Sequence, residues 1–150
     1  ALSAAAGAKV IIITDVVDSR LEDAKRFGAT HTINLKDVAD TADLVNKIKE
    51  IAPYGIDAAL EFCGRAEAAT QAIAALRIGG RYMIAGMVNP TPLDMDANNI
   101  TRKCLTIKGI HNYAPQHLGI ALKFLEENQD KFPYKELVGE TFPLEKIVCQ

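Results

Sequence analysis

The chain has 150 residues, which fits one domain spanning residues 1–150 with a substantial core. Hydrophobic residues make up 49% of it and charged residues 24%, with a net charge of −2, as in globular proteins. The sequence has no basic stripe, no apolar run that could span a bilayer and no signal-peptide pattern. We therefore expect a cytoplasmic protein that binds neither nucleic acid nor a membrane. Its three cysteines form no CxxC pair, so we expect reduced thiols and no zinc site built from them.

The first clear element is the apolar run KVIIITD at residues 9–15. Residues 1–6 before it are small and typical of a helix, which Gly7 ends as a C′ glycine would. The consecutive apolar residues 10–13 lack the alternation of a half-buried strand. The run therefore predicts a strand that is buried on both faces, as in a parallel sheet, and that ends on Asp15.

Helices and strands then alternate along the first half of the chain. Ser19 and Glu22 form a capping-box pattern at the start of one helix, and Gly28 stops it. Asp40 or Thr41 can cap the following helix. The predicted elements are a helix at 19–27, a strand at 31–35, a helix from 40 or 41 to 52 and a strand at 56–62.

The same rhythm continues in the second half. Gly79 and Gly80 predict a turn before the third core strand, and Pro115 suits the first turn of a late helix. One apolar face of that helix should point inward, formed by Leu118, Ala121, Leu122 and Leu125. The predicted elements are a helix at 67–76, a strand at 81–85, a loop at 89–92, a short strand at 93–95, a helical connector at 98–103, a strand at 104–110, a helix at 115–127, a short strand at 138–142 and the start of a helix at 144–149.

Alternating strands and helices with short connections are typical of βαβ units with right-handed crossovers. No internal linker, repeat or low-complexity segment interrupts the alternation. The sequence therefore predicts an α/β fold, a doubly wound parallel sheet with helices on both of its faces.

Ligands of open α/β sheets bind beyond the carboxyl ends of the strands. Four groups of residues follow predicted strands in this chain, and they are Asp15, Cys63-Gly64-Arg65, Gly86-Met87 and His111-Asn112. Glycine has no Cβ atom, so a cofactor can approach its backbone closely. The repetition of small residues at successive strand ends favours a cofactor site over isolated turns.

Each candidate also has an ordinary structural explanation. The Asp15 carboxylate can accept both hydroxyls of a ribose, or it can simply start a turn. Arg20 and Arg65 can reach a ribose or phosphate, or lie in solvent on a helix. Cys63 fits a buried structural thiol better than a reactive one, and His111 fits an exposed loop as well as an acid or base. No nucleophile is paired with a base by spacing, so we predict no catalytic residue.

Five stretches together resemble the coenzyme-binding domain of zinc-type medium-chain alcohol and polyol dehydrogenases. They are GAKVIIITD, SRLEDAKRFGATHTIN, GIDAALEFCG, LRIGGRYMIAG and LTIKGI. They follow the family's order and spacing over roughly residues 1–128. Each stretch alone is common in nucleotide-binding folds, whereas the combination is considerably more specific. The resemblance implies a Rossmann-type sheet.

The resemblance also implies roles at the adenosine end of a bound coenzyme. Asp15 would hold the ribose hydroxyls, which favours NAD over NADP because a 2′-phosphate would face a carboxylate. Arg20 falls where a basic residue commonly lies beside that ribose. Cys63, Gly64 and Arg65 would line the adenine and nicotinamide-ribose side.

Further implied roles concern the nicotinamide end and the assembly. The backbones of Ala85, Ile110 and Asn112 would bind the nicotinamide carboxamide by hydrogen bonds. Gly86 and Met87, at the end of a predicted strand, complete the expected coenzyme-binding residues. The strand at residues 104–110 would form a homo-oligomer interface by sheet extension, which would also cover an apolar edge.

Two parts of the family pattern are not found in this sequence. The first strand and the G-x-G-x-x-G turn would precede Ala1, and that strand would lie between the strands at 9–15 and 56–62. The catalytic domain with its zinc would also lie elsewhere. We therefore expect a part of an enzyme that is not active alone, with zinc present only in the intact enzyme.

The leading hypothesis is the NAD-binding part of an oxidoreductase that acts on a small-molecule alcohol or polyol. One alternative is an S-adenosylmethionine-dependent methyltransferase, whose sheet would end in an antiparallel hairpin. A second alternative is a non-catalytic nucleotide-binding fragment. A zinc-free quinone-reductase relative fits less well, because that branch usually prefers NADPH and Asp15 opposes a 2′-phosphate.

Overall fold

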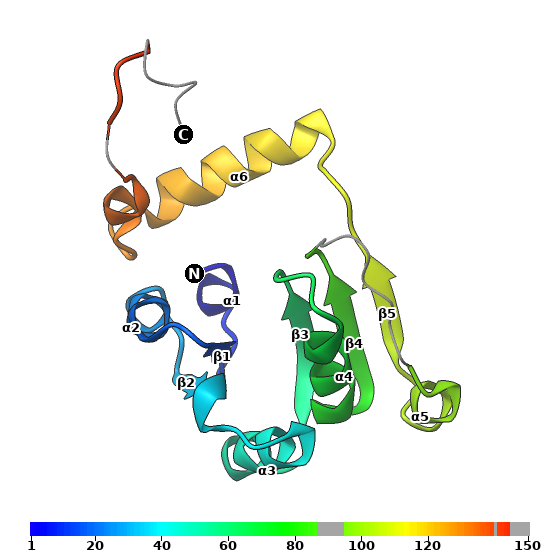
Figure 1. The fold of residues 1–150 in the computed structure, drawn as a ribbon. Helices are drawn as coiled ribbons and strands as arrows, with labels where there is room; N and C mark the ends of the chain where they lie inside the picture. Colours follow the sequence, from blue (N-terminus) through cyan, green and yellow to red (C-terminus); the bar gives the residue numbers. More distant parts are fainter. Residues whose placement is uncertain (87–94, 140, 145–150) are drawn as a thin grey trace.

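The computed structural model describes residues 1–86, 95–139 and 141–144, and their helices and strands alternate as the sequence predicts (Figure 1). The elements in chain order are α1 (Leu2–Ala5), β1 (Ile12–Asp15), α2 (Asp18–Arg26), β2 (His31–Asn34), the 3₁₀ helix η1 (Leu35–Asp37), α3 (Thr41–Ile51), β3 (Ile56–Glu61), α4 (Ala66–Ala75), β4 (Leu76–Ile84), α5 (Ala97–Arg102), β5 (Thr106–Gly109), α6 (Pro115–Asn128) and the 3₁₀ helix η2 (Tyr134–Leu137).

The strands form two parallel sheets. In the first, β1 pairs with β2, and Asp15 lies opposite Asn34. In the second, the order is β3-β4-β5, with Glu61 opposite Ile84 and Ile84 opposite Gly109. Among the residues that the structure describes, no strand pairs with β1 and β3 across the space between the two sheets (Figure 1). The parallel α/β architecture is confirmed, and its strands are divided where the family pattern places a further central strand.

The predicted turn at Gly79 and Gly80 is wrong. These glycines lie inside β4, which follows α4 directly. The pairing of β3 with β4 shifts between Ile56 and Ala58, and Gly79 has a φ of +74°. An irregular strand pair absorbs extra residues in this way, and glycine tolerates the positive φ that the irregularity requires.

The starts of two helices test the predicted caps. The Asp40 side chain accepts a hydrogen bond of 2.8 Å from the Asp43 amide, which confirms the cap of α3. The capping box at Ser19 is wrong, because α2 already begins at Asp18 and its N-cap residue makes no side-chain cap. Asp15 upstream accepts hydrogen bonds from the turn that leads into α2, so a cap farther along is not needed there.

Two clusters of buried apolar residues form the core. The first comprises Ile33, Leu44, Ile48 and Ala75, and joins β2 to α3 and the end of α4. The second comprises Ala69, Ile73, Leu76 and Tyr82, and packs α4 against β4. Because α4 contributes to both clusters, it connects the two sheets.

Residues 10–13 are not buried on both faces as predicted. Val10 is 44% exposed and Ile13 is 37% exposed. Among the described strands, β1 pairs with β2 alone, so part of this run remains open to solvent. A continuous apolar run predicts burial only where neighbouring strands and helices cover it.

The inward face predicted for α6 is also wrong. Its residues Leu118, Ala121, Leu122 and Leu125 are all exposed. The helix runs from the end of β5 back toward α2 and η2 (Figure 1). Ring contacts hold its far end, with Phe124 against Tyr134 at 6.5 Å and Tyr134 against Phe27 at 5.6 Å between centroids.

The last part of the chain differs from the prediction as well. Residues 138, 139, 141 and 142 form no strand in the structure, and the 3₁₀ helix η2 precedes them. The predicted loop at 89–92 lies outside the described residues. So do the predicted strand at 93–95 apart from Met95, and the predicted helix at 144–149 apart from Leu144.

Candidate functional site

Asp15 is held in a fixed position at the end of β1. Its Oδ1 atom accepts hydrogen bonds of 2.7 Å from the Val16 amide and 2.9 Å from the Val17 amide. Its Oδ2 atom lies 3.7 Å from a guanidinium nitrogen of Arg20. The structure therefore brings the predicted residues Asp15 and Arg20 together. The backbone amides orient the carboxylate, and 26% of its side chain is still exposed to a ligand.

The neighbouring strand β2 adds polar groups that the sequence analysis missed. The Asn34 amide nitrogen donates a 2.6 Å hydrogen bond to Asp18, and the Lys36 ammonium lies 4.0 Å from the same carboxylate. Asn34 lies opposite Asp15 in the strand register. The signal in the sequence was the polar end of the segment HTINLK, where Asn34 ends the strand and Lys36 follows it.

Glu61 organises the turn between β3 and α4, and sequence reasoning missed it too. Its side chain is buried, and Oε1 accepts a 2.5 Å hydrogen bond from the Gly64 amide. Its carbonyl oxygen accepts bonds from the Ala85 amide at 2.8 Å and the Gly86 amide at 2.9 Å. A lone charged residue at the end of an apolar strand, three residues before a glycine, was the available signal.

Gly86 lies at a close contact between two turns. A Cβ atom added there would be 2.2 Å from the Gly64 nitrogen and 2.6 Å from the Phe62 carbonyl carbon. No side chain fits at such distances. From the sequence we expect strand-end glycines to let a cofactor approach the backbone. At Gly86, the structure shows that the glycine first admits the neighbouring backbone.

The Cys63 side chain is exposed, not buried as predicted. The pKa of its thiol is raised, first by desolvation and second by a hydrogen bond to Glu61. A raised pKa lowers the fraction of the reactive thiolate at neutral pH. The chemistry of this thiol is therefore that of a weak nucleophile, although the residue lies at the surface.

The end of β5 and the turn after β4 lie side by side. The Ile110 amide donates a 3.0 Å hydrogen bond to the Ile84 carbonyl, and the Ala85 amide is bonded to Glu61. Ile110 and Ala85 can therefore offer a nicotinamide carboxamide only their carbonyl oxygens. The Asn112 amide group lies 3.1 Å from an imidazole nitrogen of exposed His111, and the Asn112 backbone has a φ of +55°.

The remaining predicted site residues are Arg65 and Met87. Arg65 is the N-cap residue of α4, and its exposed guanidinium lies 3.6 Å from the Glu67 carboxylate. Met87 lies outside the described residues. The predicted residues thus form two groups, one at the end of β1 with Asp15 and Arg20, and one at the ends of β3, β4 and β5. The two groups belong to different sheets.

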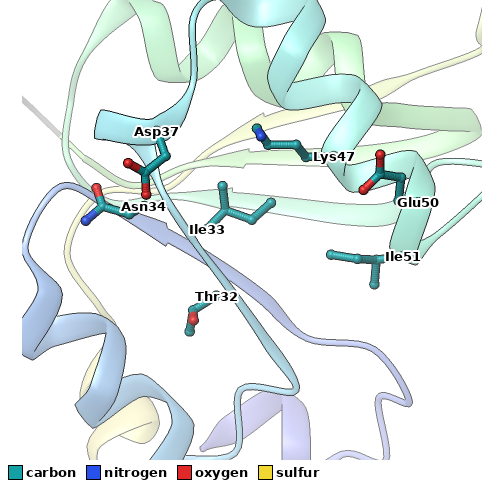
Figure 2. Close-up of a pocket in the computed structure, with 7 residues that line it drawn as sticks. All are labelled: Thr32, Ile33, Asn34, Asp37, Lys47, Glu50 and Ile51. Atoms are coloured by element: carbon teal, nitrogen blue, oxygen red, sulfur yellow. The ribbon is translucent and has the colours of Figure 1, made fainter.

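A separate hollow of about 300 Å³ lies between β2 and α3 (Figure 2). Figure 2 shows side chains from β2 and η1 on one side of it and from α3 on the other. Its lining residues are Thr32, Ile33, Asn34, Asp37, Lys47, Glu50 and Ile51. None of the predicted site residues lines this hollow, so it is not the predicted coenzyme site.

Among the residues that the structure describes, no group of three or more His, Cys, Asp or Glu side chains could hold a metal ion. The described residues therefore do not fit a zinc site. The described helices are all too short or too polar to cross a bilayer.

Residues 1–127 match the family model described as zinc-binding dehydrogenase. Sorbitol dehydrogenase of Bacillus subtilis (strain 168) is 36% identical over 115 residues, which cover 76% of this chain and 31% of that protein. L-threonine 3-dehydrogenase of Caldanaerobacter subterraneus subsp. tengcongensis is 34% identical over 141 residues, which cover 92% of this chain and 39% of that protein. The chain thus spans well under half the length of these curated relatives.

Solved structures agree with the sequence comparison. Benzyl alcohol dehydrogenase from Acinetobacter calcoaceticus has a TM-score of 0.81 and 35% identity, covering 97% of this chain and 39% of that one. An alcohol dehydrogenase zinc-binding domain protein from Burkholderia ambifaria has a TM-score of 0.82 and 37% identity, covering 97% and 38%. The parallel pairing of β4 with β5 also opposes a methyltransferase, whose last strands would form an antiparallel hairpin. The chain therefore belongs to the zinc-binding dehydrogenase family.

Proposed function

We propose that this chain is the NAD-binding part of a zinc-type alcohol or polyol dehydrogenase. The observation that carries the proposal is the Asp15 carboxylate, oriented by two backbone amides at the carboxyl end of β1. A carboxylate at this point of an α/β sheet is suited to the two hydroxyls of an adenosine ribose. It repels the 2′-phosphate of NADP, so the proposal includes a preference for NAD.

In the whole enzyme, the coenzyme would accept a hydride from the alcohol while zinc, held by residues elsewhere, polarises the alcohol oxygen. This chain's own residues would bind and orient the coenzyme. Asp15 accepts from the ribose, and the carbonyl oxygens of Ala85 and Ile110 accept from the carboxamide. The turn at Gly64 supplies backbone between these two ends.

The substrate and the assembly belong to the same proposal. A small-molecule alcohol or polyol is supported by the relatives named sorbitol dehydrogenase and benzyl alcohol dehydrogenase. A homo-oligomer through residues 104–110 is supported by the position of β5, which pairs with β4 alone among the described strands. An open edge of this kind can pair with the same edge of a second copy. A cytoplasmic location completes the proposal.

The substitution Asp15→Ala in the protein that carries this chain tests the NAD preference. Isothermal titration with NAD and with NADP should show that NAD binding weakens by about tenfold, as expected for the loss of charge-assisted hydrogen bonds. The ratio of the two dissociation constants should move toward one. The matched control is Asp23→Ala on exposed α2, which should leave both constants within about twofold. An unchanged ratio in Asp15→Ala would reject the ribose role.

A further inference from the structure

Glu61 is the one buried acidic side chain among the described residues, with 6% of its surface exposed at the end of β3. A buried carboxylate costs free energy unless its charge is compensated. Within the described residues no Lys or Arg forms an ion pair with it. Its charge is met by the Gly64 amide at 2.5 Å and by the Cys63 thiol. A buried carboxylate with these two hydrogen-bond donors fixes the conformation of the backbone around them.

The conformation that Glu61 holds is that of the turn between β3 and α4. The Gly64 amide points inward to the carboxylate, and Gly64 has a φ of +70°. A trans peptide unit is planar, so the carbonyl oxygen of Cys63 points opposite to the Gly64 amide. Glu61 thereby orients the Cys63 carbonyl oxygen away from the buried carboxylate. In this orientation the carbonyl oxygen can accept a hydrogen bond from a ligand hydroxyl.

The same residue links this turn to the neighbouring one. The Glu61 carbonyl oxygen accepts from the amides of Ala85 and Gly86, and Gly86 packs directly against the Gly64 backbone. A movement of the Glu61 side chain would therefore displace both turns at the carboxyl ends of β3 and β4. These turns carry the Gly64 backbone, which the proposed function places between the two ends of the coenzyme, and the Ala85 carbonyl oxygen, which it places at the nicotinamide carboxamide.

We propose that Glu61 is a positioning residue for coenzyme binding, which acts by fixing the Cys63–Gly64 peptide through its buried carboxylate. The inference rests on the proposed function, because it assumes that the coenzyme lies across these turns. Glu61 itself does not touch the coenzyme. Its loss should weaken ligands that span both sheets, and it should spare a ligand that reaches only the Asp15 group.

The test compares two ligands on variants of the protein that carries this chain. NAD spans both groups of site residues, whereas AMP carries only the adenosine end that Asp15 would hold. Glu61→Leu removes the acceptor for the Gly64 amide, and Glu61→Asp keeps the charge but shortens its reach. Glu61→Gln keeps the length and one acceptor oxygen. Glu127→Leu on exposed α6 is the matched control for the loss of a carboxylate.

We expect Glu61→Leu and Glu61→Asp to raise the dissociation constant for NAD by about tenfold, since small displacements of positioning groups are costly. The constant for AMP should stay within about twofold, and Glu61→Gln should restore most of the NAD affinity. Glu61→Asp decides the outcome if Glu61→Leu does not fold. Equal loss of NAD and AMP would mean general damage and would overturn the inference, as would unchanged NAD binding. If the unsubstituted protein binds AMP but not NAD, the proposed function itself fails, and the inference fails with it.

Discussion

Two of the described strands end on an acidic residue, and the surroundings of the two carboxylates give them different roles. The Asp15 side chain is 26% exposed and is shared between backbone amides and Arg20, whereas Glu61 is almost fully buried. The sequence pointed to Asp15 because it follows a run of apolar residues. The signal for Glu61 was its place at a strand end three residues before Gly64, but it did not show that the side chain is buried, because a strand without alternation does not reveal which side chains face inward.

The reactivity of Cys63 is a prediction at the residue scale. Its raised pKa should make alkylation by iodoacetamide slow at pH 8, and the rate should rise as the pH increases toward and above 9. Glu61→Gln removes the carboxylate that opposes the thiolate, so the pKa should fall and alkylation at pH 8 should accelerate by about threefold to tenfold. Peptide-resolved mass spectrometry measures both rates. Exposed Cys104 in the same sample is the control and should react at an unchanged rate.

Tyr82 carries a second residue-scale prediction. The side chain is 1% exposed, and its hydroxyl has no hydrogen-bond partner among the described residues. Burial of such a group costs about 1–3 kcal/mol, so Tyr82→Phe should leave the free energy of unfolding unchanged or raise it by up to about 1 kcal/mol. Urea unfolding at pH 7 measures this, and a loss above about 1 kcal/mol would reveal a partner for the hydroxyl.

The same residue gives stability a dependence on alkaline pH. Desolvation, followed by the nearby Glu61 and Cys63, raises the pKa of Tyr82 from 10.0 to about 12. The folded state therefore favours the neutral phenol, and this contribution is complete below pH 10 and is lost as the pH rises through 12. Tyr82→Phe should remove that part of the alkaline loss of stability.

At the scale of elements, local sequence signals predicted where a helix begins better than they predicted what the helix packs against. The cap at Asp40 and the proline at the start of α6 both mark real helix starts. The apolar stripe of α6 predicted a helix correctly but not its contacts, because periodicity defines a face without naming what covers it. The glycine pair at 79–80 misled the prediction, since glycine serves an irregular strand as readily as a turn.

Lys103 provides the clearest test of a single element, because it caps the end of α4. Its ammonium donates to the carbonyl oxygens of Ile73, Ala74 and Leu76 at 3.2, 2.9 and 2.9 Å. The last carbonyl oxygens of a helix have no hydrogen-bond partner within the helix, and the Lys103 ammonium supplies one at the end of α4. Lys103→Met keeps the aliphatic chain but removes all three bonds, and should lower the free energy of unfolding by about 1–3 kcal/mol.

The control for this prediction is Lys123→Met on exposed α6, where a surface ion pair with Glu127 contributes little. Urea unfolding of the two variants gives the comparison. An equal effect of both substitutions would mean that the three bonds of Lys103 do not stabilise α4.

At the scale of the whole molecule, the alternation of elements correctly predicted a parallel α/β fold. The family pattern also placed a further strand between the strands at 9–15 and 56–62, and β1 and β3 indeed lie in separate sheets. The solvent exposure of individual strands and helices was not predictable from this alternation. The open edge of β1 and the uncovered face of α6 depend on neighbours, and a segment's own sequence does not encode its neighbours.

The division into two sheets also explains why the candidate site was only partly predictable. The rule that ligands bind beyond strand ends selected Asp15 and the residues after β3, β4 and β5, and their roles in coenzyme binding stay predictions. Their separation into two groups follows from the sheet topology. We therefore expect a bound coenzyme to contact both groups and to connect the two sheets.

Hydrogen exchange with and without NAD, followed by mass spectrometry, shows whether the coenzyme contacts both groups in the protein that carries this chain. We expect NAD to slow exchange in two separate regions, the turn from Asp15 to Arg20 and the turn from Cys63 to Arg65. NADP at the same concentration should protect both regions less. Protection confined to the hollow between β2 and α3, or no protection at either turn, would contradict the assignment of this chain as an NAD-binding unit.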